Sequence, residues 1–435
     1  MDFDALRARL AATPTLRGEG RVLGVTGLAI RFTMPGVRVG DVVHVKRRGA
    51  PLACEVVGFH GGEAIAMPLG ALAGVGPDDE VESTGAAFGV RASEALLGRV
   101  VDGLGRPIDG APPPAVGEWV PVDRDPPAPL ERRAVDRPIA TGVRAIDALL
   151  TLGEGQRVGL FAGSGVGKST LLGAVARGVA ADVVVVGLVG ERGREVGEFL
   201  DRALGAEGRA RSVVVVATSD VAALERLRAA QVATAYAEYF RDRGARVMLL
   251  IDSVTRFARA QREVGLAAGE PPARRGYPPS VFAMLPRLLE RSGQGARGSI
   301  TAIYTVLVEG GDMDEPIADE VRGVLDGHVV LDRAVAARGR YPAIDVTTSL
   351  SRVMDAIVTP EHRASARRLR ALLATYEAKR DLVTLGAYAK GSDKELDEAL
   401  VHMPRIEALL RQDAGEKTAF DAAVGALARA VAPCR

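Results

Sequence analysis

The pattern of hydrophobic and polar residues changes along the chain and predicts regions of different architecture. Between about residues 18 and 90, short runs rich in Val, Ile and Leu are separated by Gly-Asp, Gly-Gly and Pro-Gly turn signals. Short strands at close, regular spacing predict a small antiparallel barrel or sandwich. The runs are 21–25, 28–33, 41–45, 55–59 and 63–67. From about residue 359 onward, Ala, Leu, Arg and Glu dominate in a helical pattern, which predicts a C-terminal helical domain.

Between about residues 139 and 359, apolar runs rich in β-branched residues alternate with helical patterns. These runs are 157–161, 183–189, 212–217, 247–251 and 299–308. Continuous apolar strands of this kind are buried on both faces, as in a parallel sheet covered by helices. We therefore predict an α/β core. Prolines crowd the stretch 112–138, and because proline fixes φ and lacks an N–H group, we expect an extended segment there.

The same pattern sets the predicted domain limits. At the N-terminus, Phe3, Leu6 and Leu10 stand at helical spacing. A helix this short is marginal alone, so the segment is expected either to fray or to dock on the body or a partner. We predict an N-terminal helix within 1–17, a barrel at 18–92, an α/β domain at 93–359 that includes a bridge at 93–138, and a helical domain at 360–435.

Composition narrows the class of protein. The chain has 435 residues, with 56 Lys and Arg against 55 Asp and Glu, and this near-neutral balance argues against binding nucleic acid by bulk electrostatics. Two cysteines, Cys54 and Cys434, exclude a disulfide framework and fit a reducing cytosol. No segment approaches the roughly 18 apolar residues of a membrane-spanning helix. We therefore expect a cytoplasmic protein with several domains and no nucleic-acid partner.

The strongest chemical signal is the segment AGSGVGKST at 162–170, which follows a predicted strand and opens a helix predicted at 170–180. This is the context of a phosphate-binding loop, although Ala162 replaces the first glycine of the usual pattern. Glycines let backbone N–H groups converge on a phosphate, Lys168 brings a positive charge, and the Ser169 hydroxyl suits magnesium. The predicted nucleotide-binding residues are Gly163, Ser164, Gly165, Val166, Gly167, Lys168, Ser169 and Thr170.

Two acidic residues and one arginine add candidate chemistry. Asp252 ends the apolar run 247–251, so it should emerge beside the loop at the carboxyl edge of the sheet, where ligands bind. Glu191 stands just beyond the run 183–189, where a carboxylate can orient water for attack on a terminal phosphate. Arg352 lies beyond the last core strand, from which it could act on a neighbouring subunit's nucleotide.

Five segments of the chain resemble the type III protein-export ATPases, which are similar to the catalytic beta subunit of rotary ATP synthases. The family's fold is a RecA-like P-loop NTPase core with an N-terminal small β-barrel and a C-terminal helical domain. The resemblance covers nearly the whole chain, including LGRVVDGLGRPIDG in the bridge and GAYAKGSDKELDEAL near the C-terminus. The five segments are GLFAGSGVGKST, VVVGLVGERGREVGEFL, IDSVTRFARAQREVGLAAGEPPARRGYPPSVF, YTVLVEGGDMDEPIADEVRGVLDGHVVL and YPAIDVTTSLSRVM.

The resemblance implies ATP as substrate, magnesium as cofactor and a role for particular residues. Lys168 and Ser169 match the phosphate-loop lysine and the hydroxyl that binds magnesium. Glu191 matches the catalytic glutamate, and Arg192 matches the arginine beside it. Asp252 matches the Walker B acid, which holds magnesium through water.

Two further matches concern the base and the subunit interface. Tyr341 matches the aromatic residue that stacks on adenine, and Arg352 matches the arginine finger offered to the adjacent subunit. The synthase closes its adenine pocket with a second aromatic residue. The corresponding stretch here, 409–415, has none, which predicts loose base selectivity.

The resemblance also implies partners. A homohexameric ring is expected, with 270–282 lining its central pore and 393–398 contacting a central coiled-coil stalk. The segment 1–12 resembles the helix that a stator-like regulator binds. Secretion chaperones, export cargo and the export gate at the inner membrane complete the expected partners, so the protein is expected to be cytoplasmic and peripheral at that membrane.

The resulting hypothesis is a homohexameric ATPase of a flagellar or injectisome export system, which hydrolyses ATP to release chaperones, unfold cargo and energise export. The main alternative is a catalytic or nucleotide-binding ring subunit of a rotary ATP synthase. A third hypothesis is a hexameric RNA-translocating motor. The barrel strands show no interleaving of basic and aromatic residues of the kind that base stacking requires, which argues against it.

Overall fold

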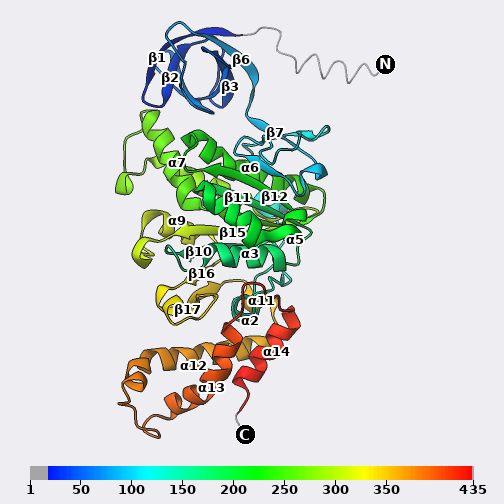
Figure 1. Cartoon of the computed structure of the whole chain (residues 1–435), viewed down its shortest axis with the longest axis vertical. Helices are drawn as coiled ribbons and strands as arrows, with labels where there is room; N and C mark the ends of the chain where they lie inside the picture. Colours follow the sequence, from blue (N-terminus) through cyan, green and yellow to red (C-terminus); the bar gives the residue numbers. More distant parts are fainter. Residues whose placement is uncertain (1–17, 434–435) are drawn as a thin grey trace.

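The computed structural model describes residues 18–433. Figure 1 shows three parts stacked along the long axis: a barrel at one end, a sheet with helices in the middle, and a group of helices at the other end. The helix predicted within 1–17 lies outside the described residues, and the domain limits given above remain predictions. None of the helices within 18–433 is both long and apolar enough to cross a membrane.

The first part is a closed barrel with strand order β1-β2-β5-β4-β3-β6, so the barrel prediction is confirmed and the sandwich alternative is wrong. Its strands alternate inward apolar and outward polar residues around a core that includes Phe32 and Val45. Cys54 is also buried there, and burial raises the pKa of its thiol to about 12. The strands are β1 (Glu19–Thr26), β2 (Ala29–Thr33), β3 (Asp41–Lys46), β4 (Leu52–His60), β5 (Glu63–Pro68) and β6 (Glu80–Ala87).

The middle part is a mixed sheet with the order β17-β16-β10-β15-β13-β11-β12-β8, and β14 pairs with β15 beside this path. The predicted parallel core is confirmed at its centre, whereas β14 and β17 run antiparallel to their neighbours. The strands are β8 (Val100–Asp102), β10 (Arg157–Ala162), β11 (Val183–Glu191), β12 (Ser212–Thr218), β13 (Arg246–Asp252), β14 (Gly293–Gln294), β15 (Ser299–Leu307), β16 (Gly327–Leu331) and β17 (Ile344–Ser351). A separate ribbon pairs β7 (Gly89–Ala92) with β9 (Glu118–Pro121).

Helices cover both faces of this sheet (Figure 1), as expected for strands that are apolar on both faces. The longest of them, α6, packs on β11, β12 and β13. The helices of this part are α2 (Arg144–Leu149), α3 (Lys168–Gly178), α4 (Gly193–Glu198), α5 (Gly205–Ala210), α6 (Ala223–Asp242), α7 (Val254–Ala267), α8 (Pro279–Glu290), α9 (Pro316–Val324), α10 (Arg333–Ala337) and α11 (Met354–Ile357), with a π-helical turn η3 (Phe199–Leu204) after α4.

The predicted C-terminal helical part is confirmed as α12 (Pro360–Thr384), α13 (Lys394–Leu410) and α14 (Phe420–Val431). These helices pack on one another and on α2 of the middle part. Asp393, in the segment expected to touch a stalk, is the N-cap of α13 and accepts hydrogen bonds from the backbone N–H groups of Glu395 and Leu396. The turn between α12 and α13 lies far from the sheet (Figure 1).

Candidate active site

The phosphate loop connects β10 to α3 at the carboxyl edge of the sheet. Gly165 and Gly167 have φ values of 80° and 90°, a region that side chains with a Cβ rarely adopt, so the loop needs glycine at both places. Helix α3 begins at Lys168, two residues before the predicted start. Val166 differs from the other predicted loop residues because its side chain is buried in the hydrophobic core, so it has only its backbone to offer to a ligand.

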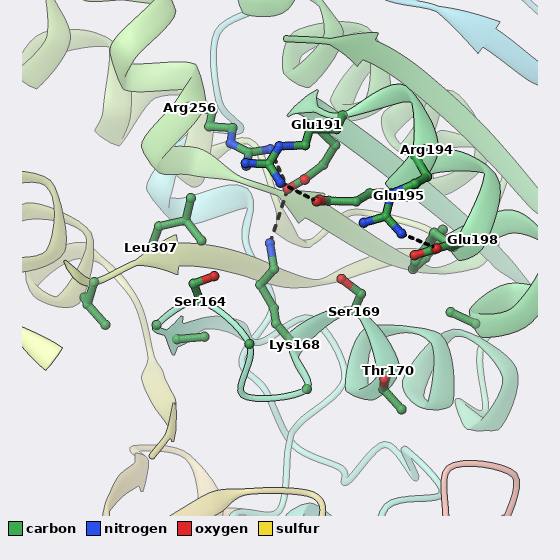
Figure 2. A pocket seen from close by; sticks show the side chains of 18 of the residues that line it. Ser164, Lys168, Ser169, Thr170, Glu191, Arg194, Glu195, Glu198, Arg256 and Leu307 are labelled. Carbon is green, nitrogen blue, oxygen red and sulfur yellow. Dashed lines mark hydrogen bonds and ion pairs between the residues drawn. The ribbon is translucent and has the colours of Figure 1, made fainter. Parts of the chain in front are cut away.

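Three predicted catalytic residues meet above this loop. The Lys168 ammonium forms ion pairs with Asp252, at the end of β13, and with Glu191, at the end of β11. Its Nζ lies 3.3 Å from Glu191 Oε1, and Figure 2 shows the side chain rising from the loop toward that carboxylate. Thr305 on β15 also donates a hydrogen bond of 2.7 Å to Asp252 Oδ1. Because both carboxylates are buried, these pairings compensate the cost of removing their charges from water.

Arg256 belongs to the site although the sequence analysis did not identify it. Its Nη1 lies 2.6 Å from Glu191 Oε1 and donates to the carbonyl of Gly190 at 2.7 Å. Figure 2 shows Arg256 on the opposite side of the Glu191 carboxylate from Lys168. The available signal was its position in the first turn of α7, four residues after Asp252. Glu191 is thus held between two cations.

Arg192 is placed differently from its neighbour. It lines the cavity beside the loop, but its side chain is 74% exposed and its ion pair is with Glu195 at 3.4 Å. The structure therefore brings Glu191 to Lys168 and leaves Arg192 facing solvent. In this arrangement Arg192 is available to a molecule that enters the cavity.

The cavity over the loop has a volume of about 800 Å³. Basic side chains outnumber acidic ones along its wall, which suits a polyanionic ligand. Its predicted loop residues are Gly163, Ser164, Gly165, Gly167, Lys168, Ser169 and Thr170; its other charged residues are Arg177, Glu191, Arg192, Arg194, Glu195, Glu198, Arg202, Arg256, Glu309 and Arg333.

The predicted magnesium ligands fit the ion's chemistry. Ser169 offers a hydroxyl in the cavity, and Asp252 offers a carboxylate that Lys168 and Thr305 hold in place. Among residues 18–433 no cluster of three or more His, Cys, Asp or Glu side chains is arranged to hold a metal. Magnesium usually takes one or two protein oxygens together with water and substrate phosphate oxygens, and a hydroxyl and one carboxylate are such a set.

A smaller cavity of about 200 Å³ adjoins the first and shares Gly167 and Thr170 with it. Tyr341 lies on one wall, with ring atoms 3.7 Å from the position that a Cβ on Gly167 would occupy. Another part of the wall comes from the segment after α13 and consists of Gln412, Asp413, Ala414 and Glu416. The second wall therefore exists, and it contains no aromatic ring.

Arg352 lies in neither cavity. It follows β17 at the edge of the sheet, where its backbone N–H donates to the Asp326 carbonyl at 3.0 Å and its Nη2 to the Arg322 carbonyl at 3.5 Å. Burial lowers the pKa of nearby His328, and the positive charges of Arg322 and Arg352 lower it further. Arg352 therefore does not line the phosphate site of its own chain.

Comparison with known proteins agrees with this geometry. The family described as "ATP synthase alpha/beta family, nucleotide-binding domain" matches residues 142–351, and the "T3SS EscN ATPase C-terminal domain" matches residues 358–429. The fold and site therefore define a P-loop ATPase of the ATP synthase alpha/beta type.

The full-length relatives are more specific. The chain is 52% identical over 418 residues to a type 3 secretion system ATPase of Xanthomonas euvesicatoria, covering 96% of this chain and 95% of that protein. It is 50% identical over 418 residues to a flagellum-specific ATP synthase of Bacillus subtilis, covering 95% of each. The chain belongs to the family of type III secretion and flagellar ATPases.

Solved structures support the same assignment. The assembled ATPase EscN from the enteropathogenic Escherichia coli type III secretion system matches with a TM-score of 0.90 and 45% identity, covering 95% of this chain and all of that one. EscN in complex with its central stalk EscO matches with a TM-score of 0.88 and 44% identity over the same shares. These matches favour the export ATPase hypothesis over a synthase ring subunit.

Proposed function

We propose that this ATPase works as a ring of identical copies that powers a bacterial type III protein export system. The observation that supports a ring is the position of Arg352. One chain holds a complete phosphate site, yet its candidate finger lies at the sheet edge and lines neither cavity. Identical neighbours arranged in a closed ring can complete one another's sites.

The side chains of the site account for hydrolysis of the terminal phosphate. When ATP enters, the Lys168 ammonium moves from the two carboxylates to the β- and γ-phosphate oxygens, because the triphosphate carries more negative charge than either carboxylate. Glu191, still fixed by Arg256, then orients a water molecule and accepts its hydrogen bond for in-line attack. Ser169 and, through water, Asp252 would hold magnesium, which would neutralise part of the phosphate charge when bound. Arg352 of the adjacent copy stabilises the negative charge that develops on the transferred phosphate.

The proposed partners follow from the family and from the shape of the chain. EscN has been solved with a central stalk, and by analogy the segment 393–398 of this chain, which is the N-cap and first residues of α13, contacts a coiled-coil stalk. The segment 1–12 binds a stator-like regulator. The ring works in the cytoplasm, peripheral to the inner membrane. Its other partners are secretion chaperones, cargo and the export gate.

The direct test is a Lys168→Ala substitution in the full chain. Loss of the ammonium removes the charge that holds the phosphates, so we expect ATP binding to weaken and steady-state hydrolysis to fall below detection. The Lys379→Ala variant is the matched control, because Lys379 pairs with Asp393 in the C-terminal helices. Unchanged hydrolysis by Lys168→Ala protein that retains its circular dichroism spectrum would show that the site assignment is wrong.

A further inference from the structure

Arg333 is a basic side chain in the phosphate cavity to which the predicted mechanism gives no role. It lies in the first turn of α10, directly after β16, which pairs in parallel with the phosphate-loop strand β10. The pairing ends with Leu331 opposite Ala162, so Arg333 and Ser164 each stand two residues beyond the last paired positions. The topology of the sheet therefore places an arginine beside the strand end of the phosphate loop.

The guanidinium group lies against the loop backbone. Its Nε and Nη2 atoms are 3.3 Å and 3.5 Å from the position that a Cβ on Gly163 would occupy. The Asp332 side chain accepts a hydrogen bond of 2.8 Å from the Val335 backbone N–H group and so fixes the turn that carries Arg333. A larger residue at 163 would meet this side chain, which means that the absence of a side chain at Gly163 allows the close approach.

The charge of Arg333 is not used within the described chain. Four other arginines of the same cavity, Arg177, Arg192, Arg194 and Arg256, each have an ion pair or hydrogen bond with a protein oxygen. Arg333 has none among residues 18–433, and the same holds for Arg202 on η3. Of these two, only Arg333 contacts a glycine of the loop.

We propose that Arg333 is a phosphate-binding residue of its own subunit that contacts the terminal phosphate of the bound nucleoside triphosphate. The inference rests on the proposed ATP site. Tyr341 lies beside Gly167 at the helix end of the loop, so the base lies at that end and the phosphate chain extends toward the strand end, where Arg333 is. A guanidinium presents parallel N–H donors that match two phosphate oxygens. Arg333 therefore distinguishes a triphosphate from a diphosphate.

The test measures binding without hydrolysis. Full-length Arg333→Ala protein is titrated by calorimetry with a non-hydrolysable ATP analogue and with ADP, each with magnesium. Loss of a charge-assisted contact should weaken binding of the triphosphate by about tenfold or more, with less than about threefold for ADP. Arg333→Lys keeps the charge and loses the paired donors, so its affinity for the triphosphate analogue should lie between those of Arg333→Ala and the unsubstituted protein. Arg338→Ala, just after the same helix, removes an arginine that pairs with Glu377 and should bind both nucleotides normally.

The outcomes separate this inference from the proposed function. Equal weakening for both nucleotides, or none for either, in folded Arg333→Ala protein would overturn the role of Arg333. If Arg333→Ala does not fold, Arg333→Gln is measured with the same criteria. Lys168→Ala is measured in parallel: if it abolishes binding while Arg333→Ala has no effect, the ATP site stands and only the Arg333 proposal fails. Normal binding by Lys168→Ala would contradict the site itself.

Discussion

The carboxylate of Glu191 has a cation on each side. Lys168 reaches it from the phosphate loop and Arg256 from α7, with Arg256 the closer at 2.6 Å against 3.3 Å. When a nucleotide attracts Lys168, Arg256 remains as the group that fixes the carboxylate. The backbone strengthens this role, since the same guanidinium donates to the carbonyl of Gly190. We therefore infer that Arg256 positions the proposed catalytic glutamate.

We predict that Arg256→Ala lowers kcat by about 100-fold, because a glutamate that is not held in place loses most of its contribution to acid–base catalysis. The KM for ATP should change much less, and Arg256→Lys should restore part of kcat. Steady-state kinetics provides both values. Glu263→Ala on the same helix, which breaks a partly exposed pair with Arg226, serves as the control. A rise in KM with unchanged kcat would argue against the positioning role.

Site residues that lie within one continuous sequence motif could be predicted from the sequence. Site residues that reach the site only because the chain folds could not. The segment 162–170 carries its own glycine spacing, so the loop, Lys168 and Ser169 were identified directly. Arg256 and Arg333 are single arginines in a chain rich in arginine. What gives them a role is the neighbouring strand order, β10 beside β16 and β11 beside β13, and no local pattern encodes that order.

At the scale of elements, the strands that could be predicted from the sequence are those with a clear local pattern of apolar residues. The β-branched central strands are buried on both faces and stood out as apolar runs. β6 has only Val81 buried, and β8 has three residues within the turn-dense bridge, so neither produced an alternating pattern. The extended segment was expected only at 112–138, after β8, and no strand was predicted for the part of the bridge before it. β8 lies in that earlier part and extends the sheet beside β12, because a short segment can complete an edge that is already formed.

One ion pair joins the barrel to the core. Glu55 on β4 pairs with Arg228 on α6, with Glu55 Oε2 2.8 Å from Arg228 Nε, and the two side chains are only 6% and 9% exposed. Arg228 also donates to Gln231 at 2.7 Å and lies over the ring of Phe88. Removing one partner of such a pair leaves a buried charge without compensation.

We predict that Arg228→Ala lowers the free energy of unfolding by about 3 kcal/mol, measured by urea denaturation of the full chain. The double variant Glu55→Gln with Arg228→Met should have a free energy of unfolding closer to that of the unsubstituted protein, because no isolated charge remains. Arg226→Ala on the same helix, which loses a partly exposed pair, should cost less than about 1 kcal/mol. Equal effects of Arg226→Ala and Arg228→Ala would show that burial of the Glu55 pair contributes nothing.

At the scale of the whole molecule, the decisive feature is that the finger and the phosphate site of one chain are separated. Arg352 follows the edge strand β17, whereas Glu191 ends β11 well inside the sheet order. In the proposed ring, Arg352 of one copy meets the phosphate site of the next across each interface. In this arrangement hydrolysis depends on assembly, and a change in one subunit is felt at the site of its neighbour.

We predict that Arg352→Ala protein assembles but hydrolyses ATP at least about 1000-fold more slowly. Mixing it with Glu191→Gln protein should restore part of the activity, because some interfaces then combine an intact Glu191 with an intact Arg352. Steady-state ATPase assays over a series of mixing ratios, with assembly followed by light scattering, provide the measurement. Absence of rescue at every ratio would indicate that Arg352 acts within its own chain or has no part in catalysis.

The smaller cavity, beside Tyr341, lies between the core and the C-terminal helices. Arg144 of α2 donates to the carbonyl of Leu409 and pairs with Glu416, while the Gln412 backbone N–H group donates to the Tyr341 carbonyl at 2.8 Å. If the base binds beside Tyr341 as proposed, a planar inhibitor that filled this space would compete with it and bridge the core and the C-terminal helices. Resistance to such a compound would then arise in two segments far apart in sequence, around residue 341 and at 412–416.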